Sequence, residues 1–167
     1  MLAMLRSSIS TPAGPMYAAV ADDGVLEELW LPNRRKDWTA KLGSTQAADA
    51  FERLTRQLDE YFRGRRRVFD IPMRTAGSQF EASVWHRLQR IPYGCTISYG
   101  EIARDLGLQN GARAVGRANG ANPIPILIPC HRVIGADGSL VGFGGGIRLK
   151  RYLLELEGAI EPPLRLL

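Results

Sequence analysis

The residues with the clearest chemical potential are a cysteine and a histidine that are adjacent in the chain, Cys130 and His131. A cysteine thiol becomes a nucleophile only as its thiolate, which needs a base or a cation nearby. Because neighbouring side chains in an extended chain point in opposite directions, a turn or a water molecule must connect these two. Taken alone, the pair favours a buried structural cysteine, and a nucleophilic cysteine is the alternative that the other motifs must support.

The segment before this pair is apolar and rich in proline, from Asn122 to Pro129. Its composition predicts a buried strand that ends at Cys130. Proline lacks an amide donor and fixes its own backbone angle, so Pro129 predicts a held turn at the nucleophile. The segment thus indicates a rigid mounting for one side chain.

Metal chemistry is not expected from this sequence. The chain has two cysteines and two histidines, and their positions show neither C-x-x-C nor H-x-x-x-H spacing: Cys95, Cys130, His86 and His131. We therefore predict no metal site and no cofactor. A disulfide framework is also not expected, because two cysteines are too few for one.

Composition limits the class of protein further. The 167 residues are 45% hydrophobic and 23% charged, which excludes a disordered, collagenous or coiled-coil chain. A net charge of +5 permits an anionic partner without requiring one. There is no apolar run near 18 residues and no signal-like start. We expect a cytoplasmic protein with no membrane span.

Two short helices in the second half resemble a DNA-binding arrangement. Ser98-x-x-Glu101 is a capping box that begins the first helix, which ends at Gly107. Asn110 can cap the second helix, from Gly111 to about Gly120. So tight a connection is typical of a helix-turn-helix, although a plain helical hairpin is the commoner explanation.

The predicted second helix has a basic face free of bulky side chains. Helical spacing places four residues on this face, namely Arg113, Gly116, Arg117 and Gly120. Spacing places three others on the opposite face, namely Ala112, Val115 and Ala118. Residues 106–136 contain no Asp or Glu. This pattern favours close approach of DNA, and the alternative is tight packing against another helix.

The remaining elements predict an α+β protein of two domains. Residues 17–20 and 25–31 form a predicted hairpin, and a helix is expected from Ser44 to about Arg63. The basic run 65–67 is interpreted as a solvated helix end. A link at 74–77 separates a domain of residues 1–76 from one of residues 77–167. A second capping box, Ser78-x-x-Glu81, begins the second domain. A last helix carries Glu157 just before Gly158.

Taken in order, the motifs resemble those of the O6-alkylguanine-DNA alkyltransferases. The resemblance is carried by Pro129-Cys130-His131-Arg132-Val133, by the preceding Arg113-Ala114-Val115-Gly116 and Asn122-Pro123, and by the following Gly142-Phe143-Gly144-Gly145-Gly146. It covers about residues 80–158 at motif level and is looser before them. It implies a small N-terminal ribonuclease-H-like domain of sheet plus helix, and a mainly helical C-terminal domain with a helix-turn-helix.

The resemblance also implies a function and site residues. An alkyl group would move irreversibly from O6 of guanine, with O4 of thymine as a second candidate, to Cys130 of a monomer that acts once. His131 would remove the thiol proton through a water, Glu157 would orient His131, and Asn122 would hold the turn. Double-stranded DNA carrying O6-alkylguanine would bind through its minor groove, with the target nucleotide rotated out of the stack.

The family pattern assigns the other contacts by position. The residues implied in DNA binding are Ser98, Tyr99, Ala112, Arg113, Gly116 and Arg117, with Arg113 filling the vacated stack and Tyr99 assisting rotation. The residues implied in the substrate pocket are Asn119, Pro125, Val133, Phe143 and Gly144. Many members carry Tyr at the position of Phe143, and some have a side chain at Gly144. These two departures concern substrate range and leave the sulfur chemistry unchanged.

Two other functions remain open from the sequence. A protein that only binds and flags alkylated DNA would keep Tyr99 and Arg113 important and leave Cys130 dispensable. A cysteine hydrolase would use Cys130 and His131 with turnover and without DNA. The cysteine itself argues against the first, because the non-catalytic alkyltransferase-like proteins replace it.

Overall fold

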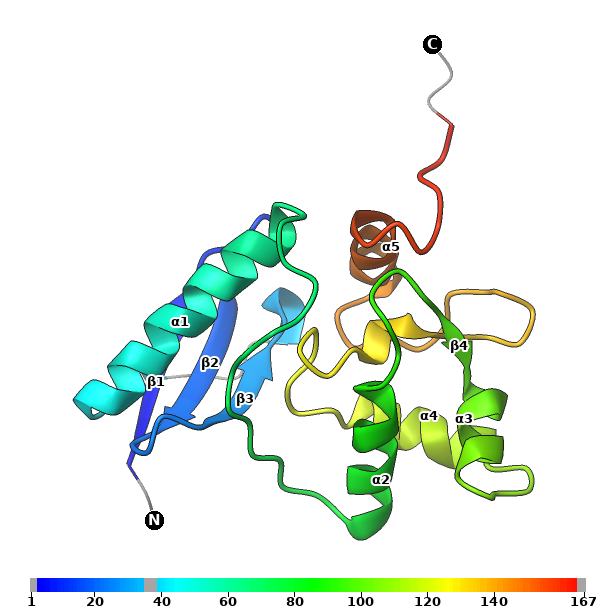
Figure 1. Cartoon of the computed structure of the whole chain (residues 1–167), viewed down its shortest axis with the longest axis horizontal. Coiled ribbons are helices and arrows are strands. Elements are labelled where there is room, and N and C mark those ends of the chain that lie inside the picture. Colours follow the sequence, from blue (N-terminus) through cyan, green and yellow to red (C-terminus); the bar gives the residue numbers. More distant parts are fainter. Residues whose placement is uncertain (1–2, 35–38, 165–167) are drawn as a thin grey trace.

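The N-terminal part of the chain is a three-stranded antiparallel sheet covered by one long helix. The computed structural model describes residues 3–34 and 39–164. Strands β1 (Met4–Ile9), β2 (Met16–Ala21) and β3 (Leu26–Trp30) pair in that order. Helix α1 (Thr45–Phe62) packs across β1 and β2, as Figure 1 shows. The predicted hairpin and first helix are confirmed, with each boundary within two residues.

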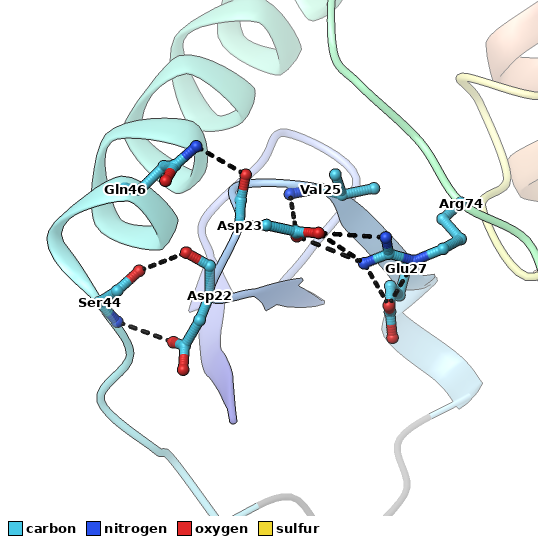
Figure 2. Close-up of polar contacts among 7 residues, drawn as sticks. All are labelled: Asp22, Asp23, Val25, Glu27, Ser44, Gln46 and Arg74. Carbon is cyan, nitrogen blue, oxygen red and sulfur yellow. Dashed lines mark hydrogen bonds and ion pairs between the residues drawn. The ribbon is translucent and has the colours of Figure 1, made fainter. Parts of the chain in front are cut away.

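The start of α1 is tied to the turn between β2 and β3. The backbone amide of Ser44 donates to Oδ1 of Asp22 over 2.9 Å, and the Ser44 hydroxyl donates to the Asp22 carbonyl over 2.7 Å (Figure 2). The same hydroxyl oxygen accepts from the amide of Ala47, which caps the helix. One serine thus sets both where α1 begins and how it meets the sheet.

The segment after α1 returns along β3 before it leaves the N-terminal part. The amide of Leu26 donates to the carbonyl of Pro72, and the amide of Arg74 donates to the carbonyl of Leu26, each over 2.9 Å. The Arg74 guanidinium forms ion pairs with Asp23 and Glu27 (Figure 2). Residues 72–74 are therefore held to the edge of the sheet.

The C-terminal part is mainly helical and lies on the β3 side of the molecule (Figure 1). Helices α2 (Gln79–Leu88), α3 (Tyr99–Asp105) and α4 (Ala112–Gly120) contact one another. A two-residue parallel ladder joins β4 (Ile97–Ser98) to β5 (Val133–Ile134), and α5 (Ile147–Leu156) follows. The α+β class is confirmed, and so are both capping boxes, which begin α2 and α3.

Two local predictions about α4 are wrong. Asn110 does not cap this helix: Gly111 occupies the cap position without a side-chain hydrogen bond, and Asn110 adopts a positive φ of 52°. Left-handed backbone suits asparagine and removes it from the cap geometry. Ala112 is exposed and does not share the buried face of Val115 and Ala118.

The apolar run before the nucleophile is buried but is not a strand. Ile124, Ile126 and Ile128 are each at most 2% exposed. The chain turns within this run, and Ile126 has a φ of +73°, a conformation rare for β-branched residues. The short 3-10 helix η2 (Cys130–Arg132) follows directly. The held turn is therefore built from successive turns, and the prediction of a strand is corrected.

Burial joins the two parts into one continuous set of apolar contacts that includes Leu54 and Leu58 of α1 and Leu153 of α5. The backbone also crosses between them, where the amide of Leu29 donates to the carbonyl of Pro123 over 2.9 Å. Within residues 3–34 and 39–164, no helix has the length and apolar character needed to cross a membrane.

Candidate active site

Cys130 is the first residue of η2 and lies on the wall of a pocket. Its residue is 5% exposed, and its amide donates to the Ile128 carbonyl over 2.8 Å. The pocket is partly open to solvent, and its lining includes Asn122, Pro125 and Phe143 beside the cysteine. The thiol can therefore be reached from the pocket.

Asn122 holds the turn before the cysteine by bonds at both ends of its amide. Its Nδ2 donates to the Ile128 carbonyl over 2.7 Å, and its Oδ1 accepts from the Ile124 amide over 3.0 Å. Burial raises the pKa of the Cys130 thiol to about 11, and hydrogen bonding by Asn122 opposes this rise in part. The Cys130 side chain is therefore a protonated thiol at neutral pH.

His131 and Glu157 form a fully buried pair behind the cysteine. His131 Nε2 lies 2.7 Å from Glu157 Oε1, and both side chains have 0% exposure. Glu157 is the C-terminal cap residue of α5, so the end of that helix delivers the carboxylate to η2. The His131 Nδ1 atom has no hydrogen-bond partner within residues 3–34 and 39–164.

Two other side chains bind the same carboxylate. Arg132 donates through Nε to Oε2 and through a terminal nitrogen to Oε1, each over 2.9 Å. Tyr61 of α1 donates its hydroxyl to Oε1 over 2.7 Å. Burial alone would raise the pKa of Glu157, but the hydrogen bonds from His131 and Arg132 lower it to about 2. Glu157 is therefore an anion.

The protonation of His131 follows from this anion. A carboxylate only accepts hydrogen bonds, so Nε2 must carry the proton of the neutral ring and Nδ1 keeps its lone pair. Burial lowers the pKa of His131, although Glu157 opposes that shift. The imidazole is thus neutral at pH 7 with an acceptor nitrogen available, which is the state a general base requires.

The pocket is lined by both halves of the chain. The C-terminal residues of the lining include Asn122, Cys130 and Phe143. The N-terminal residues of the lining are Leu29, Trp30, Leu31 and Arg34. The sequence interpretation gave the N-terminal domain no part in the site, and no local motif there marks these residues.

The glycine-rich segment that covers the pocket is bound to the N-terminal 3-10 helix η1 (Pro32–Arg34). Asn33 Nδ2 donates to the Gly145 carbonyl over 2.6 Å, and Arg34 Nε donates to the Gly144 carbonyl over 3.2 Å. A Cβ atom built on Gly144 would lie 2.8 Å from the Arg34 guanidinium carbon. Glycine at this position therefore makes room for Arg34.

Lys150 of α5 is a buried cation that the sequence interpretation missed. Lys150 is 0% exposed, and its Nζ donates to the carbonyls of Val133 and Val141. Burial lowers its pKa to about 8, while the nearby Cys130 opposes that shift. Lys150 thus ties the strand after the nucleophile to the glycine-rich segment. One lysine in an amphipathic helix gives no sequence signal for such a role.

The residues expected to bind DNA gather around a second, open groove. Its lining consists of Tyr99, Ala112, Arg113, Gly116, Arg117, Val141 and Gly142. Arg113 and Arg117 are exposed, and the Tyr99 hydroxyl donates to the Val141 carbonyl over 3.1 Å. Ser98 lies outside this lining and uses its hydroxyl to cap α3. Gly142 lines both this groove and the pocket of Cys130.

Four of the five expected pocket residues line the pocket, namely Asn119, Pro125, Phe143 and Gly144. Val133 does not: it is fully buried, and its carbonyl accepts from Lys150. Asn119 Nδ2 donates to the Cys130 carbonyl over 3.3 Å. Within the described ranges, no cluster of three His, Cys, Asp or Glu side chains is suited to a metal ion.

Comparison with known proteins gives the same family over both parts. Residues 4–75 match the ribonuclease-like domain of 6-O-methylguanine DNA methyltransferase, and residues 79–159 match its DNA binding domain. The methylated-DNA–protein-cysteine methyltransferase of Mycobacterium tuberculosis is 46% identical over 160 residues, which is 93% of each chain. That of Methanosarcina acetivorans is 38% identical over 161 residues, 93% of this chain and 99% of the other.

Solved structures agree in fold and in sequence. The M. tuberculosis O6-methylguanine methyltransferase has a TM-score of 0.82 and 43% identity over 96% of both chains. The M. tuberculosis protein OGT in complex with DNA has a TM-score of 0.80 and 45% identity over 91% of both chains. The ribonuclease-like N-terminal fold expected from the motifs is confirmed. From its first strand to its last helix, the chain belongs to the 6-O-methylguanine DNA methyltransferase family.

Proposed function

We propose that this protein repairs O6-methylguanine in DNA by transferring the methyl group to its own Cys130. The observation that carries the proposal is that one glycine, Gly142, borders both the pocket of the buried thiol and the basic groove of α4. A base that leaves a duplex bound in the groove therefore has a short path to the sulfur. Family membership over both domains supports the same activity.

The proposed reaction is a displacement at the methyl carbon. The Cys130 thiolate forms a bond from Sγ to this carbon, and the bond from the carbon to O6 breaks with its electron pair on the oxygen. The guanine leaves as the neutral base after it takes up one proton. Because a thiolate is a poor leaving group from the methyl carbon of a thioether, the product S-methylcysteine is permanent and each protein molecule acts once.

His131 is the general base for this step. A thiol whose pKa is about 11 is almost wholly protonated at neutral pH, so its proton must be removed as the substrate reacts. The Nδ1 atom of His131 accepts that proton through a water molecule, and the Glu157 anion stabilises the imidazolium that forms. Asn122 keeps the sulfur at the pocket wall through the turn that it holds.

DNA binds along the basic groove of the protein that α4 lines. Helix α4 itself enters the minor groove of the duplex. Arg113 replaces the extruded base in the stack, Tyr99 guides the rotating nucleotide, and Arg117 neutralises phosphate charge. The small residues Ala112 and Gly116 let the helix approach closely, and Ser98 sets the start of α3. Minor-groove contacts distinguish bases poorly, so little sequence preference is expected.

The base then enters the pocket between the two domains. Phe143 stacks on the base, Pro125 and Asn119 shape the wall beside the sulfur, and the amide of Gly144 donates to O6. The carbonyl of Cys130 accepts from the exocyclic amine through the lone pair that Asn119 leaves available. The Val133 carbonyl, expected to share this role, is buried outside the pocket and accepts from Lys150 instead. Since Phe143 has no hydroxyl, the base is held there by stacking alone.

The assembly and boundaries follow from the same picture. We place the domain boundary between residues 76 and 77, because the ion pairs of Arg74 end the contacts with the sheet and Ser78 caps the next helix. The protein acts as a monomer, because the pocket and the groove belong to one chain. It acts in the cytoplasm, where thiols such as that of Cys130 stay reduced. No cofactor takes part, since the displacement needs only the thiol and a base.

The test is the mass of the intact protein after incubation with a duplex that contains one O6-methylguanine. One added methyl group per protein, mapped to the Cys130 peptide and absent in Cys130→Ser, is the expected result. Lesion-selective binding without any mass change would identify a damage-flagging protein and overturn the proposal. A release of methanol with repeated turnover would identify a hydrolase.

A further inference from the structure

Tyr61 is an N-terminal residue that touches the catalytic carboxylate. It lies in the last turn of α1, is 0% exposed, and donates its hydroxyl to Glu157 Oε1 over 2.7 Å across 96 residues of sequence. This bond is as short as the bond between His131 and the same oxygen. A residue of the N-terminal domain thus contacts the base assembly, by which we mean His131 and Glu157, directly.

Among the residues that the structure describes, four hydrogen bonds reach the carboxylate of Glu157. Oε1 accepts from His131, from Tyr61 and from Arg132, while Oε2 accepts from Arg132. The charge on Oε1 is therefore shared between the imidazole and the phenol. Each additional donor lowers the proton affinity of that oxygen and weakens its attraction for the imidazolium.

We propose that Tyr61 is a positioning residue for the alkyl transfer, which fixes Glu157 Oε1 against His131 and lowers the basicity of that histidine. The proposal rests on the roles of His131 and Glu157 in the proposed function. A less basic His131 stays neutral, and so able to accept the thiol proton, down to a lower pH. The N-terminal domain would then set the lower pH limit of repair.

The hydroxyl is not required to fill space. The Tyr61 ring packs against Phe62, Phe69 and Tyr93 at centroid distances of 5.4, 5.5 and 6.3 Å. A phenylalanine ring would keep these contacts, because it differs only by the oxygen. Tyr61→Phe therefore removes one hydrogen bond to Glu157 and leaves the aromatic cluster in place.

The charged and titratable groups around His131 come from four parts of the chain. They are Tyr61 of α1, Tyr93 of the segment after α2, Cys130 and Arg132 of η2, and Lys150 and Glu157 on α5 and its cap. Arg132 and Lys150 are cations that lower the pKa of His131, and Glu157 raises it. Tyr61 acts on His131 only through Glu157, which separates its effect from theirs.

The first experiment measures the pKa of His131 by ¹⁵N NMR in the free protein. The chain has two histidines, so His86→Gln, an exposed substitution, leaves His131 as the single signal. In this background, Tyr61→Phe is expected to raise the pKa of His131 by about half a unit or more, because Oε1 loses a competing donor. An unchanged or lowered pKa would overturn the proposal.

Tyr93→Phe is the matched control. The Tyr93 hydroxyl belongs to the same aromatic cluster but donates to the Leu156 carbonyl over 3.3 Å. Its removal is expected to leave the His131 pKa within about 0.2 units, since no bond to Glu157 is lost. An equal shift in Tyr93→Phe and Tyr61→Phe would show a general effect of the cluster and contradict the proposal.

The second experiment follows the pH dependence of single-turnover methyl transfer. The low-pH limb of the rate profile is expected to move upward in Tyr61→Phe by the same amount as the His131 pKa. Combining Tyr61→Phe with Glu157→Gln should abolish this shift, because the shared acceptor is gone. If the low-pH limb of Tyr61→Phe does not move and the variant only has a lower melting temperature, Tyr61 has a structural role alone.

A third measurement needs no substitution at Tyr61. In the wild-type protein, the resonance of the Tyr61 hydroxyl proton is expected to shift as the pH changes. The midpoint of this shift should equal that of the His131 titration, because both groups bind the same oxygen. A tyrosine resonance that stays constant would overturn the proposal. These NMR results require no DNA, so their failure is distinct from a failure of methyl transfer, which the mass of the protein reports.

Discussion

His131 Nε2 lies 2.7 Å from Glu157 Oε1, and neither side chain is exposed to solvent. This contact holds the imidazole in the tautomer whose Nδ1 can accept a proton. Burial raises the pKa of the Cys130 thiol, on the preceding residue, to about 11. The structure therefore combines an imidazole that can accept a proton with a thiol that is protonated at neutral pH.

The free protein is expected to show two cysteines of very different reactivity toward iodoacetamide. Cys95 is exposed and Cys130 is buried. With a pKa of about 11, only about 0.1% of Cys130 is thiolate at pH 8. Timed labelling with mass analysis of the two peptides should therefore show Cys95 modified at least about 10-fold faster. Similar rates in the native protein, rather than only in urea, would contradict a buried thiol.

Glu157→Gln is expected to destabilise the protein by about 3–5 kcal/mol at pH 7, because Arg132 is left buried without its anion. The pKa of Glu157 is about 2 in the fold against 4.5 ordinarily, so its contribution is present above pH 4.5 and is lost as the pH falls toward 2. Urea unfolding of both proteins from pH 7 to 3 checks this. A stability difference that widens on acidification would show the opposite sign.

Lys150→Met should loosen the glycine-rich segment, because two carbonyls lose their donor. A cost of about 1–3 kcal/mol at pH 7 is expected for the unmade bonds. Burial lowers the pKa of Lys150 to about 8 from 10.5, so the wild type should gain stability relative to the variant as the pH rises between these values. Hydrogen exchange at residues 141–146 should accelerate in the variant, and unchanged exchange there would refute the tie.

Arg113→Ala should impair lesion extrusion more than DNA binding. The side chain is exposed beside the groove, so its removal leaves the fold intact. Fluorescence of a base analogue in the duplex should show less extrusion, and the rate of methyl transfer should fall about 10-fold or more. Arg53→Ala, an exposed arginine of α1, is the charge-matched control. Equal losses in both variants would reduce Arg113 to a general electrostatic contribution.

Arg117→Ala should instead weaken binding to damaged and undamaged duplexes alike. If Arg117 contacts one phosphate, the slope of log affinity against log salt should decrease in magnitude by about 1. Anisotropy titrations at several salt concentrations provide the measurement. An unchanged slope would place Arg117 away from the DNA backbone.

Local signals predicted local structure well. The capping boxes at Ser78 and Ser98 begin α2 and α3 as expected, because their bonds lie within four residues of sequence. The loss of the Asn110 cap has an equally local reason, since its backbone is left-handed. The apolar run before Cys130 was harder to interpret, because burial alone does not distinguish a strand from successive turns.

Contacts between residues far apart in the chain could not be predicted from the sequence. Tyr61 reads as one more apolar position of α1, and only the packing of α1 against the end of α5 brings its hydroxyl to Glu157. Asn33 and Arg34 bind the glycine-rich segment across more than 100 residues. Lys150 carries no motif because its partners are backbone carbonyls. Roles like these depend on a folded interface that no single segment encodes.

The order of the base assembly along the chain has a consequence for protein synthesis. Tyr61 is made first, Cys130 and His131 follow, and Glu157 comes 26 residues after His131. A ribosome therefore makes Cys130 and His131 before Glu157. A nascent chain that ends between His131 and Glu157 has the imidazole without its carboxylate partner. The contact between His131 and Glu157 can form only after the last helix, α5, has been made.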